Sequence, residues 1–232
     1  MKKTIAILPV VVLALIQSAH SQGFINLNFE SANVSGYSPD SSDVPTTSAL
    51  PGWTVYYSNS SGTNAATQVW YDGISLGGAI ISIIDTNAPS FSPIQGKYSA
   101  FLFGGGTSEN LLSASISQTG LVPVGTQSLL FDAYVSGNSF NVMLGGQTIN
   151  MTPLQTFANY TLYGGNIPSN FAGQSELLSF TEPPATGTQP SMFELDNIQF
   201  SSSVVPEPST LALCALGGLF LAWRNRRICS KA

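Results

Sequence analysis

Histidine, cysteine and arginine are all missing from residues 22–203, and Lys97 is the one basic residue in that span. The chain has a single histidine, His20, and two cysteines, Cys214 and Cys229, all outside this span. Without these residue types the span cannot form a Ser-His-Asp or Cys-His nucleophile, a His/Cys zinc site, a disulfide or an arginine clamp. Its chemistry therefore depends on carboxylates, amides, hydroxyls and aromatic rings.

Positive charge is correspondingly scarce. Twelve acidic residues lie between Glu30 and Glu207, where a single lysine opposes them, so this span carries a net charge of −11. Such a surface offers no electrostatic footprint for nucleic acid, and it repels anionic polymers and lipids. Charged residues make up only 8% of the chain, which differs from the high-charge composition of disordered segments. We expect a folded domain with no nucleic-acid partner.

Long apolar runs are confined to the two ends of the chain. Near the N-terminus, two lysines precede an uncharged apolar run at residues 5–16, which is too short for a comfortable membrane span. Ala19 and Ser21 place small residues at the two positions that a signal peptidase reads. These features predict a signal peptide over residues 1–21 that is cleaved before Gln22, with an uncleaved N-terminal anchor as the alternative.

A second uncharged apolar run covers residues 210–223. As a helix it would span roughly 21 Å, against about 30 Å of hydrocarbon. Arg224, Arg226 and Arg227 follow it, so the positive-inside rule predicts a cytoplasmic C-terminus with the bulk of the chain outside. The sequence thus predicts a short transmembrane helix that holds the chain at the inner membrane.

A Pro-Glu-Pro triplet, Pro206, Glu207 and Pro208, stands just before this run. The triplet, the short apolar helix and the terminal arginine cluster, in that order, resemble the PEP-CTERM sorting signal. The resemblance covers residues 205–227. It implies recognition at the triplet by an exosortase, a membrane-embedded cysteine transpeptidase, followed by removal of the helix and delivery to the cell surface or extracellular matrix. An ordinary tail anchor is the alternative.

Between the two ends, short alternating apolar runs are separated by turns rich in glycine and proline, and no segment has sustained helical periodicity. Residues 25–30 alternate most strictly and predict the first strand. About eleven or twelve strands at this spacing predict an all-β fold, an antiparallel β-sandwich. Gly145-Gly146 predicts a hairpin and residues 104–106 a turn. The expected organisation is a signal peptide at 1–21, a sandwich domain at 22–203 and a sorting tail at 204–232.

Five short motifs also occur along the domain in a fixed order. Together they resemble the galactose-binding-like jelly roll that many carbohydrate-binding modules use. The resemblance implies a jelly-roll sandwich with a structural calcium ion, held by acidic residues at the positions of Glu30 and Asp196. The motifs are Asn26–Glu30, Pro51–Trp53, Gly96–Ala100, Ile116–Gln118 and Glu194–Ile198.

The residues themselves support a cation near Asp196. Apolar residues in 193–200 change phase beside Asp196, which predicts a β-bulge there. If the first and last strands lie side by side, Glu30 and Asp196 meet, and two adjacent carboxylates repel unless a cation lies between them. Oxygen ligands of this kind select Ca²⁺. The alternative is that each carboxylate faces water or accepts backbone N–H bonds.

Two aromatic pairs are candidates for stacking on a sugar ring. Trp70-Tyr71 ends one predicted strand, and Tyr56-Tyr57 leads into a polar loop. Packing in the core is the alternative for both.

Three functions remain open at this point. The leading one is a non-catalytic surface or matrix protein that binds or organises extracellular polysaccharide. The second is a sugar-binding module with a defined ligand. The third is a carboxylate-dependent glycoside hydrolase of jelly-roll type. Four carboxylates are available for hydrolysis, but their spacing assigns no acid or nucleophile. They are Asp72, Asp85, Asp132 and Glu176.

Overall fold

The structure, a computed structural model, describes residues 23–206 except 41, 60, 74–77, 89–90, 108–109, 138–139 and 185–190. The predicted signal peptide, its cleavage site and the predicted tail helix with its arginines lie outside the described residues, as do Glu207 and Pro208. Pro206 is the last residue described. In the described part of the chain, none of the helices has the length and apolar character needed to span a bilayer.

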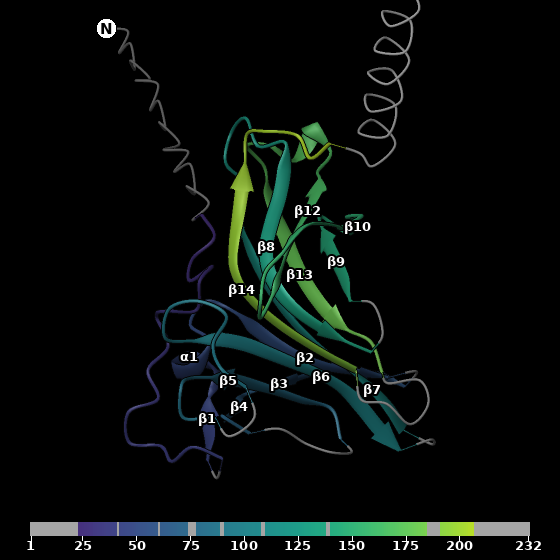
Figure 1. The fold of residues 1–232 in the computed structure, drawn as a ribbon. Helices are drawn as coiled ribbons and strands as arrows, with labels where there is room; N and C mark the ends of the chain where they lie inside the picture. The colour runs from purple at the N-terminus through teal and green to yellow at the C-terminus, as the bar shows by residue number, and fades with distance from the viewer. Residues whose placement is uncertain are drawn as a thin grey trace, which may run out of the picture.

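The described strands form two sheets, which the β6–β7 hairpin connects (Figure 1). The first sheet follows the order β3-β2-β7-β13-β9-β10, and the second the order β1-β4-β5-β6-β14-β8-β12-β11. The first contains β2 (Thr54–Asn59), β3 (Gly62–Ala66), β7 (Asn110–Leu121), β9 (Asn141–Leu144), β10 (Gln147–Thr148) and β13 (Ser175–Glu182). The second contains β1 (Asp43–Pro45), β4 (Gln68–Tyr71), β5 (Ile80–Ile84), β6 (Ser99–Thr107), β8 (Ser128–Ser136), β11 (Thr152–Thr156), β12 (Thr161–Asn166) and β14 (Ser191–Ser201). The short helices α1 (Thr46–Ala49) and η1 (Ser169–Phe171) lie in connections.

The core lies between the sheets because alternate residues of each strand point inward. An aromatic cluster joins the two layers: the ring of Phe131 meets that of Phe180 edge-on at 5.3 Å and that of Phe193 at 6.0 Å. All three side chains are fully buried. Trp53 is buried as well and packs on Phe29 and Phe180.

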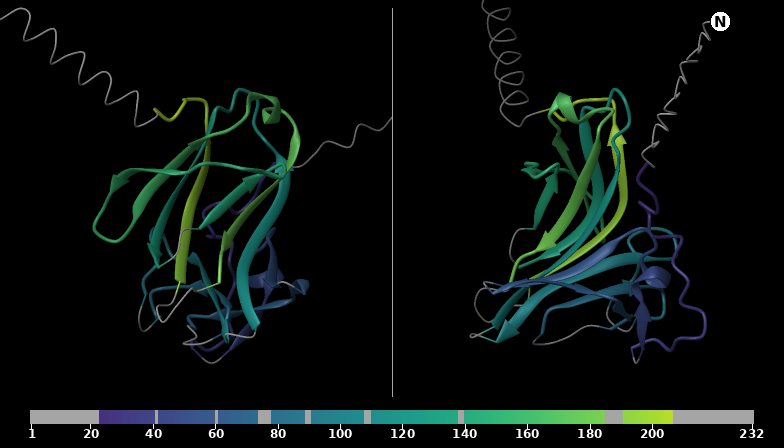
Figure 2. Two further views of the ribbon diagram at one scale, coloured as in Figure 1. Left: turned by 90° about the vertical axis from the view of Figure 1, so that its right-hand side faces the viewer. Right: turned by 180° about the vertical axis from the view of Figure 1, so that it is seen from behind.

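The predicted antiparallel jelly-roll sandwich is confirmed, and Figure 2 shows its curled strands from two further sides. Among the described strands, β4 and β5 form the one parallel pair. The hairpin at Gly145-Gly146 is also confirmed, since β9 pairs with β10 and both glycines have positive φ, 57° and 76°. The bulge beside Asp196 is present, because the pairing of β14 with β8 shifts register between Asp196 and Gln199.

The strand predicted at residues 25–30 is wrong, because Asn26 and Phe29 adopt positive φ, 50° and 56°, and the segment turns. Here a side chain supplies the hydrogen bonds that a neighbouring strand would otherwise make. The N–H of Ile25 donates to Oε1 of Gln118 at 2.6 Å, and Nε2 of Gln118 donates to the carbonyl of Ile25 at 3.0 Å. The amide group of one side chain thus acts as a short piece of neighbouring strand.

The turn predicted at residues 104–106 is also wrong, since all three residues lie within β6. The small size of Gly104 and Gly105 allows close packing. A Cβ on Gly104 would lie 1.9 Å from the carbonyl oxygen of Pro183, and one on Gly105 would lie 2.8 Å from Gly78. Glycine at these positions lets backbone approach backbone.

Candidate functional site

Glu30 and Asp196, far apart in sequence, line one small hollow of about 180 Å³. The N–H of Ile198 donates to the carbonyl of Leu27 at 2.9 Å, which holds the first segment beside the bulge of β14. The predicted meeting of chain start and last strand is therefore present, although the first segment is a turn and not a strand. The hollow is lined by Asn28, Glu30, Gln95, Gly96, Asp196 and Asn197.

Asp196 is 1% exposed. Its Oδ2 accepts the N–H of Gln95 at 3.0 Å and its Oδ1 accepts the N–H of Asn197 at 2.6 Å. Burial raises the pKa of Asp196 to about 7, with repulsion from Glu30 and Asp132 adding to the rise. The side chain amides of Gln95 and Asn197 both donate to Oδ2 of the buried Asp132. Carboxylates therefore gather here with amides rather than cations as partners.

Glu30 faces the loop before β6. Its Oε1 accepts the N–H of Lys97 at 2.7 Å and that of Tyr98 at 3.0 Å. Gly96 has φ 60°, and a Cβ there would lie 2.3 Å from the same oxygen. The described residues hold no group of three or more His, Cys, Asp or Glu side chains that could bind a metal ion. A Ca²⁺ ion at this hollow would thus combine the two predicted carboxylates with amide, carbonyl or water oxygens, a donor set that suits this ion.

Trp70 and Tyr71 do not form a joint platform. They are neighbours on β4 and point to opposite faces, so Trp70 is 41% exposed whereas Tyr71 is 5% exposed and lies in the core. The hydroxyl of Tyr71 donates to Oδ2 of Asp85 at 2.7 Å. The prediction that Tyr71 stacks on a sugar is therefore wrong.

Tyr56 and Tyr57 are separated in the same way. Tyr57 shares its face of β2 with the fully buried Val55, packs against the core, and accepts the N–H of Ile81 on its hydroxyl oxygen at 3.0 Å. Burial raises its pKa. Its stacking on a sugar stays a prediction. Tyr56 is half-buried on the outer face of the first sheet, opposite Ser115 of β7. Tyr56 and Trp70 belong to different sheets and so act singly if they bind.

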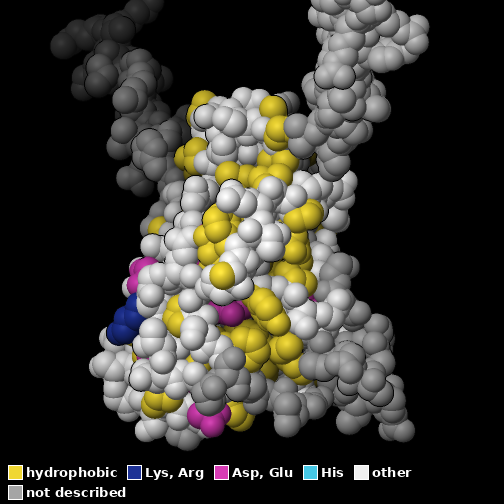
Figure 3. Space-filling view, viewed as in Figure 1, with side chains coloured by type: hydrophobic (Ala, Val, Ile, Leu, Met, Phe, Trp, Pro, Cys, Tyr) yellow, Lys and Arg dark blue, Asp and Glu magenta, His cyan; other side chains and the backbone are white. Residues whose placement is uncertain are grey.

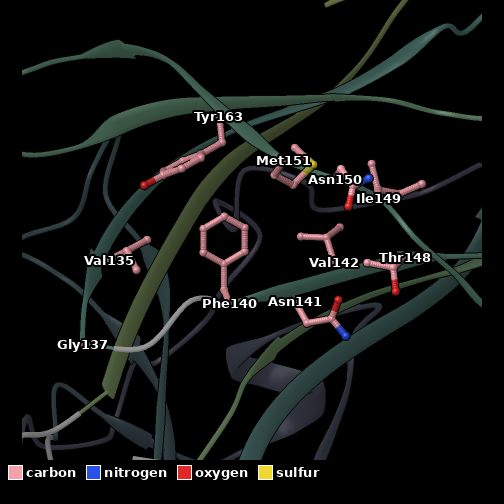
Figure 4. A pocket seen from close by; sticks show the side chains of 10 residues that line it. All are labelled: Val135, Gly137, Phe140, Asn141, Val142, Thr148, Ile149, Asn150, Met151 and Tyr163. Carbon is pink, nitrogen blue, oxygen red and sulfur yellow. The ribbon is translucent and has the colours of Figure 1, made fainter. Parts of the chain in front are cut away.

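A larger pocket, of about 460 Å³, opens where β9 and β10 of the first sheet meet β8 and β12 of the second (Figure 4). Its aromatic side consists of Phe140 and Tyr163, both half-buried, with ring centroids 5.0 Å apart and planes at 85°. Phe140 in turn stacks on the core residue Phe193 at 4.7 Å. The aromatic wall is thus fixed by the core behind it.

The opposite side of the pocket is polar and uncharged. Asn141, Thr148 and Asn150 are exposed there, and Figure 4 shows their polar ends apart from the aromatic pair. Among the described residues, no charged side chain lines the pocket, which otherwise comprises Val135, Gly137, Val142, Ile149 and Met151. An aromatic wall facing amides and a hydroxyl fits a neutral ligand with apolar faces and hydroxyl groups. Sequence reasoning missed this site, because its residues look like ordinary strand and turn residues.

The carboxylates considered for hydrolysis do not form such a pocket. Oδ1 of Asp72 accepts the N–H of Asp85 at 2.7 Å, and the two side chains are 1% and 3% exposed. Burial raises the pKa of Asp72 to about 7. Burial also works to raise the pKa of Asp85, but hydrogen bonds, that of Tyr71 foremost, lower it overall. Neither residue of this pair lines the pockets described here.

The sequence profile of the PEP-CTERM protein-sorting motif matches residues 204–227. The chain therefore carries this motif, which implies export and exosortase-dependent processing. No curated protein matches the sequence.

The comparison with solved structures finds several chains that are similar to this one. TmCBM61 in complex with β-1,4-galactotriose is 14% identical over 78% of this chain and 99% of its own, with a TM-score of 0.42. A cyclase from Fischerella sp. TAU is 17% identical over 77% and 94%, with a TM-score of 0.41. The family 11 carbohydrate-binding module from Clostridium thermocellum is 11% identical over 71% and 96%, with a TM-score of 0.33. Similarity at these TM-scores assigns no function to this chain, and its own residues are the basis for one.

Proposed function

We propose that this chain is an exported, non-catalytic surface or matrix protein whose sandwich binds neutral extracellular polysaccharide in the Phe140–Tyr163 pocket. The observation that carries the proposal is the composition of that pocket, an aromatic pair opposite uncharged amides and a hydroxyl. An exosortase would process the tail and release the protein from the inner membrane to the cell surface.

The charge of the molecule supports a neutral ligand. With twelve acids and one lysine between Glu30 and Glu207, the protein repels anionic polymers but is indifferent to neutral sugars. Figure 3 shows a face on which uncharged and apolar side chains prevail, with acidic groups at few places and one basic patch at its left edge. Hydroxyl-bearing ligands would replace water on such a surface without a large electrostatic cost.

The binding we propose is weak. Each hydrogen bond between the protein and a sugar hydroxyl replaces bonds to water and contributes only about 0.5–1.5 kcal/mol. A few such bonds and one aromatic contact give a Kd on the order of 0.1–1 mM. Retention on a polymer then depends on many protein copies per chain or on immobilisation at a surface.

Absence of catalysis is part of the proposal. Residues 22–203 offer carboxylates as their only strong acid–base groups, and one neighbouring pair, Asp72 and Asp85, is buried. The glycoside hydrolase alternative needs two carboxylates beside a bound sugar. In the part of the chain that the structure describes, no carboxylate lines the proposed pocket.

We further propose that Glu30 and Asp196 hold a structural Ca²⁺. The two carboxylates share a hollow, and the pKa of Asp196 is raised by burial and by its acidic neighbours. A cation there would relieve that repulsion and tie the first segment to β14.

Affinity electrophoresis of the purified domain in gels that contain neutral polysaccharides tests the binding proposal. We expect retardation of the wild type, and its loss in the double variant Asn141→Ala/Asn150→Ala, whose side chains are exposed and not part of the core. Trp70→Ala is the matched control and should keep the retardation. Retardation lost in Trp70→Ala but kept in the double variant would assign binding to β4 instead. Release of reducing ends, stopped by a single carboxylate substitution, would replace the proposal with the hydrolase.

A further inference from the structure

The sorting motif begins inside the folded domain. Its match starts at residue 204, and Val205 is 8% exposed. The N–H of Val205 donates to Oδ1 of Asn166 at 2.7 Å, and Nδ2 of Asn166 donates to the carbonyl of Val205 at 2.9 Å. Both backbone polar groups of Val205 are therefore occupied by one side chain amide at the end of β12.

The residues just before the motif are also fixed. Nε2 of Gln127 donates to the carbonyl of Ser202 at 2.5 Å, and Oγ of Ser128 donates to that of Ser203 at 2.7 Å. Figure 2 shows this segment after β14 running over the end of the sandwich near η1. The described chain thus has no free linker between its last strand and the motif.

The sandwich also provides space for the side chain of Val205. A Cβ on Gly164 of β12 would lie 2.9 Å from Cγ2 of Val205, so glycine is needed for this approach. Val205 and Pro206 themselves line a hollow of about 530 Å³, together with Asn166, Pro168 and residues after β10. The start of the motif is seated in the surface of the domain.

We propose that Asn166 is a positioning residue that latches the start of the sorting motif to the sandwich, and that the exosortase acts on the motif only after this latch opens. An enzyme that acts at the adjacent Pro-Glu-Pro triplet must surround the chain on both sides of the bond that it breaks. The backbone groups of Val205 cannot bind Asn166 and the enzyme at once. The inference depends on the motif and not on what the sandwich binds.

Pulse-chase labelling of the full-length protein, in a bacterial host that contains the exosortase, tests the latch. In Asn166→Ala both hydrogen bonds to Val205 are lost, and we expect conversion of precursor to processed form to become about tenfold faster. Gln118→Ala is the matched control, because Gln118 makes the same pair of bonds to Ile25 at the other end of the described chain. It should leave the rate unchanged.

A second variant keeps Asn166 and frees the motif. Inserting Gly-Ser-Gly-Ser between Ser203 and Val204 lengthens the tether that holds Val205 beside Asn166, so the latch should open more often and processing should become faster. It also covers the case in which Asn166→Ala unfolds the domain. An unchanged rate in the insertion variant, or slower processing in both variants, would overturn the proposal. Acceleration by Gln118→Ala to the same degree would mean that general loosening, and not the latch, sets the rate.

Discussion

At the scale of single residues, the domain stands out for buried carboxyl groups that have no cationic partner. Among the described residues, Oδ2 of Asp72, Oε2 of Glu182 and Oε1 of Glu194 are buried without a hydrogen-bond partner. Burial raises the pKa of Glu182 to about 7 and that of Glu194 to about 8. With a single lysine between residues 22 and 203, protonation takes the place of ion pairing at these sites.

The raised pKa of Glu182 predicts that the stability of the domain depends on pH. Its pKa is higher in the folded than in the unfolded chain, so its stabilising contribution is complete at low pH and is lost as the pH rises toward about 7. Glu182→Gln removes the titration and keeps an acceptor for Ser191. Between about pH 4 and pH 8, the wild type should therefore lose on the order of 2–3 kcal/mol more unfolding free energy than the variant. Urea denaturation at both pH values measures this, and equal losses would contradict it.

Calcium binding at Glu30 and Asp196 predicts a dependence on chelators. A ligand that binds only the folded state adds about 2.7 kcal/mol at a hundredfold excess over its Kd. EDTA should therefore lower the melting temperature of the wild type and leave that of Asp196→Ala unchanged. Identical melting curves of the wild type with and without EDTA would rule out a structural ion.

At the scale of elements, sequence patterns predicted the strands that alternate clearly and missed three of the four strands at the sheet edges, all but β10. β1, β3 and β11 were not predicted, and each is the outermost strand of its sheet. Edge strands are short and polar, so they lack the apolar period that marks an inner strand. The Glu30–Asp196 contact was predictable because it follows from chain order. The Phe140–Tyr163 pocket was not predictable, because it depends on how β9 and β10 of the first sheet lie relative to β8 and β12 of the second.

Neighbouring side chains of β4 point to opposite faces of the sheet. Substitutions of Trp70 and Tyr71 should therefore differ in their effect on stability. Tyr71→Phe removes the buried hydrogen bond to Asp85 and should lower the unfolding free energy by about 1–3 kcal/mol. Trp70→Ala removes a side chain that is 41% exposed and should cost clearly less. Denaturant unfolding of the two variants compares them. A larger cost for Trp70→Ala would mean that its packing against Gly73 dominates.

At the scale of the whole molecule, the negative net charge predicts different behaviour toward neutral and anionic polysaccharides. A weak, neutral binding site predicts retention on neutral polysaccharide that changes little between low and moderate salt. The charge of −11 predicts exclusion from anionic polysaccharide at low salt, with the exclusion relieved as salt rises. Sedimentation with both polymer types over a salt series measures this. Retention on the anionic polymer at low salt would contradict the proposed ligand class.

Processing at both ends predicts the mass of the surface form. The mature chain should begin at Gln22 and end within the region of Pro206 to Pro208, without the apolar run of residues 210–223. Intact-mass spectrometry of protein recovered from the cell surface measures both ends. A steady-state species that retains the run would identify an ordinary tail anchor.

The scarcity of lysine has a practical consequence for chemical labelling. Lys97 is exposed, and a mature chain cut at the predicted sites would carry its ammonium as the only side chain amine. The hydrogen bond to Tyr98 raises the pKa of Lys97, so amine-reactive dyes would couple best in alkaline buffer. The backbone of Lys97 donates to the carboxylate of Glu30. A fluorophore attached there would sit beside the proposed ion site, and its emission would report the arrival of Ca²⁺ without any engineered cysteine.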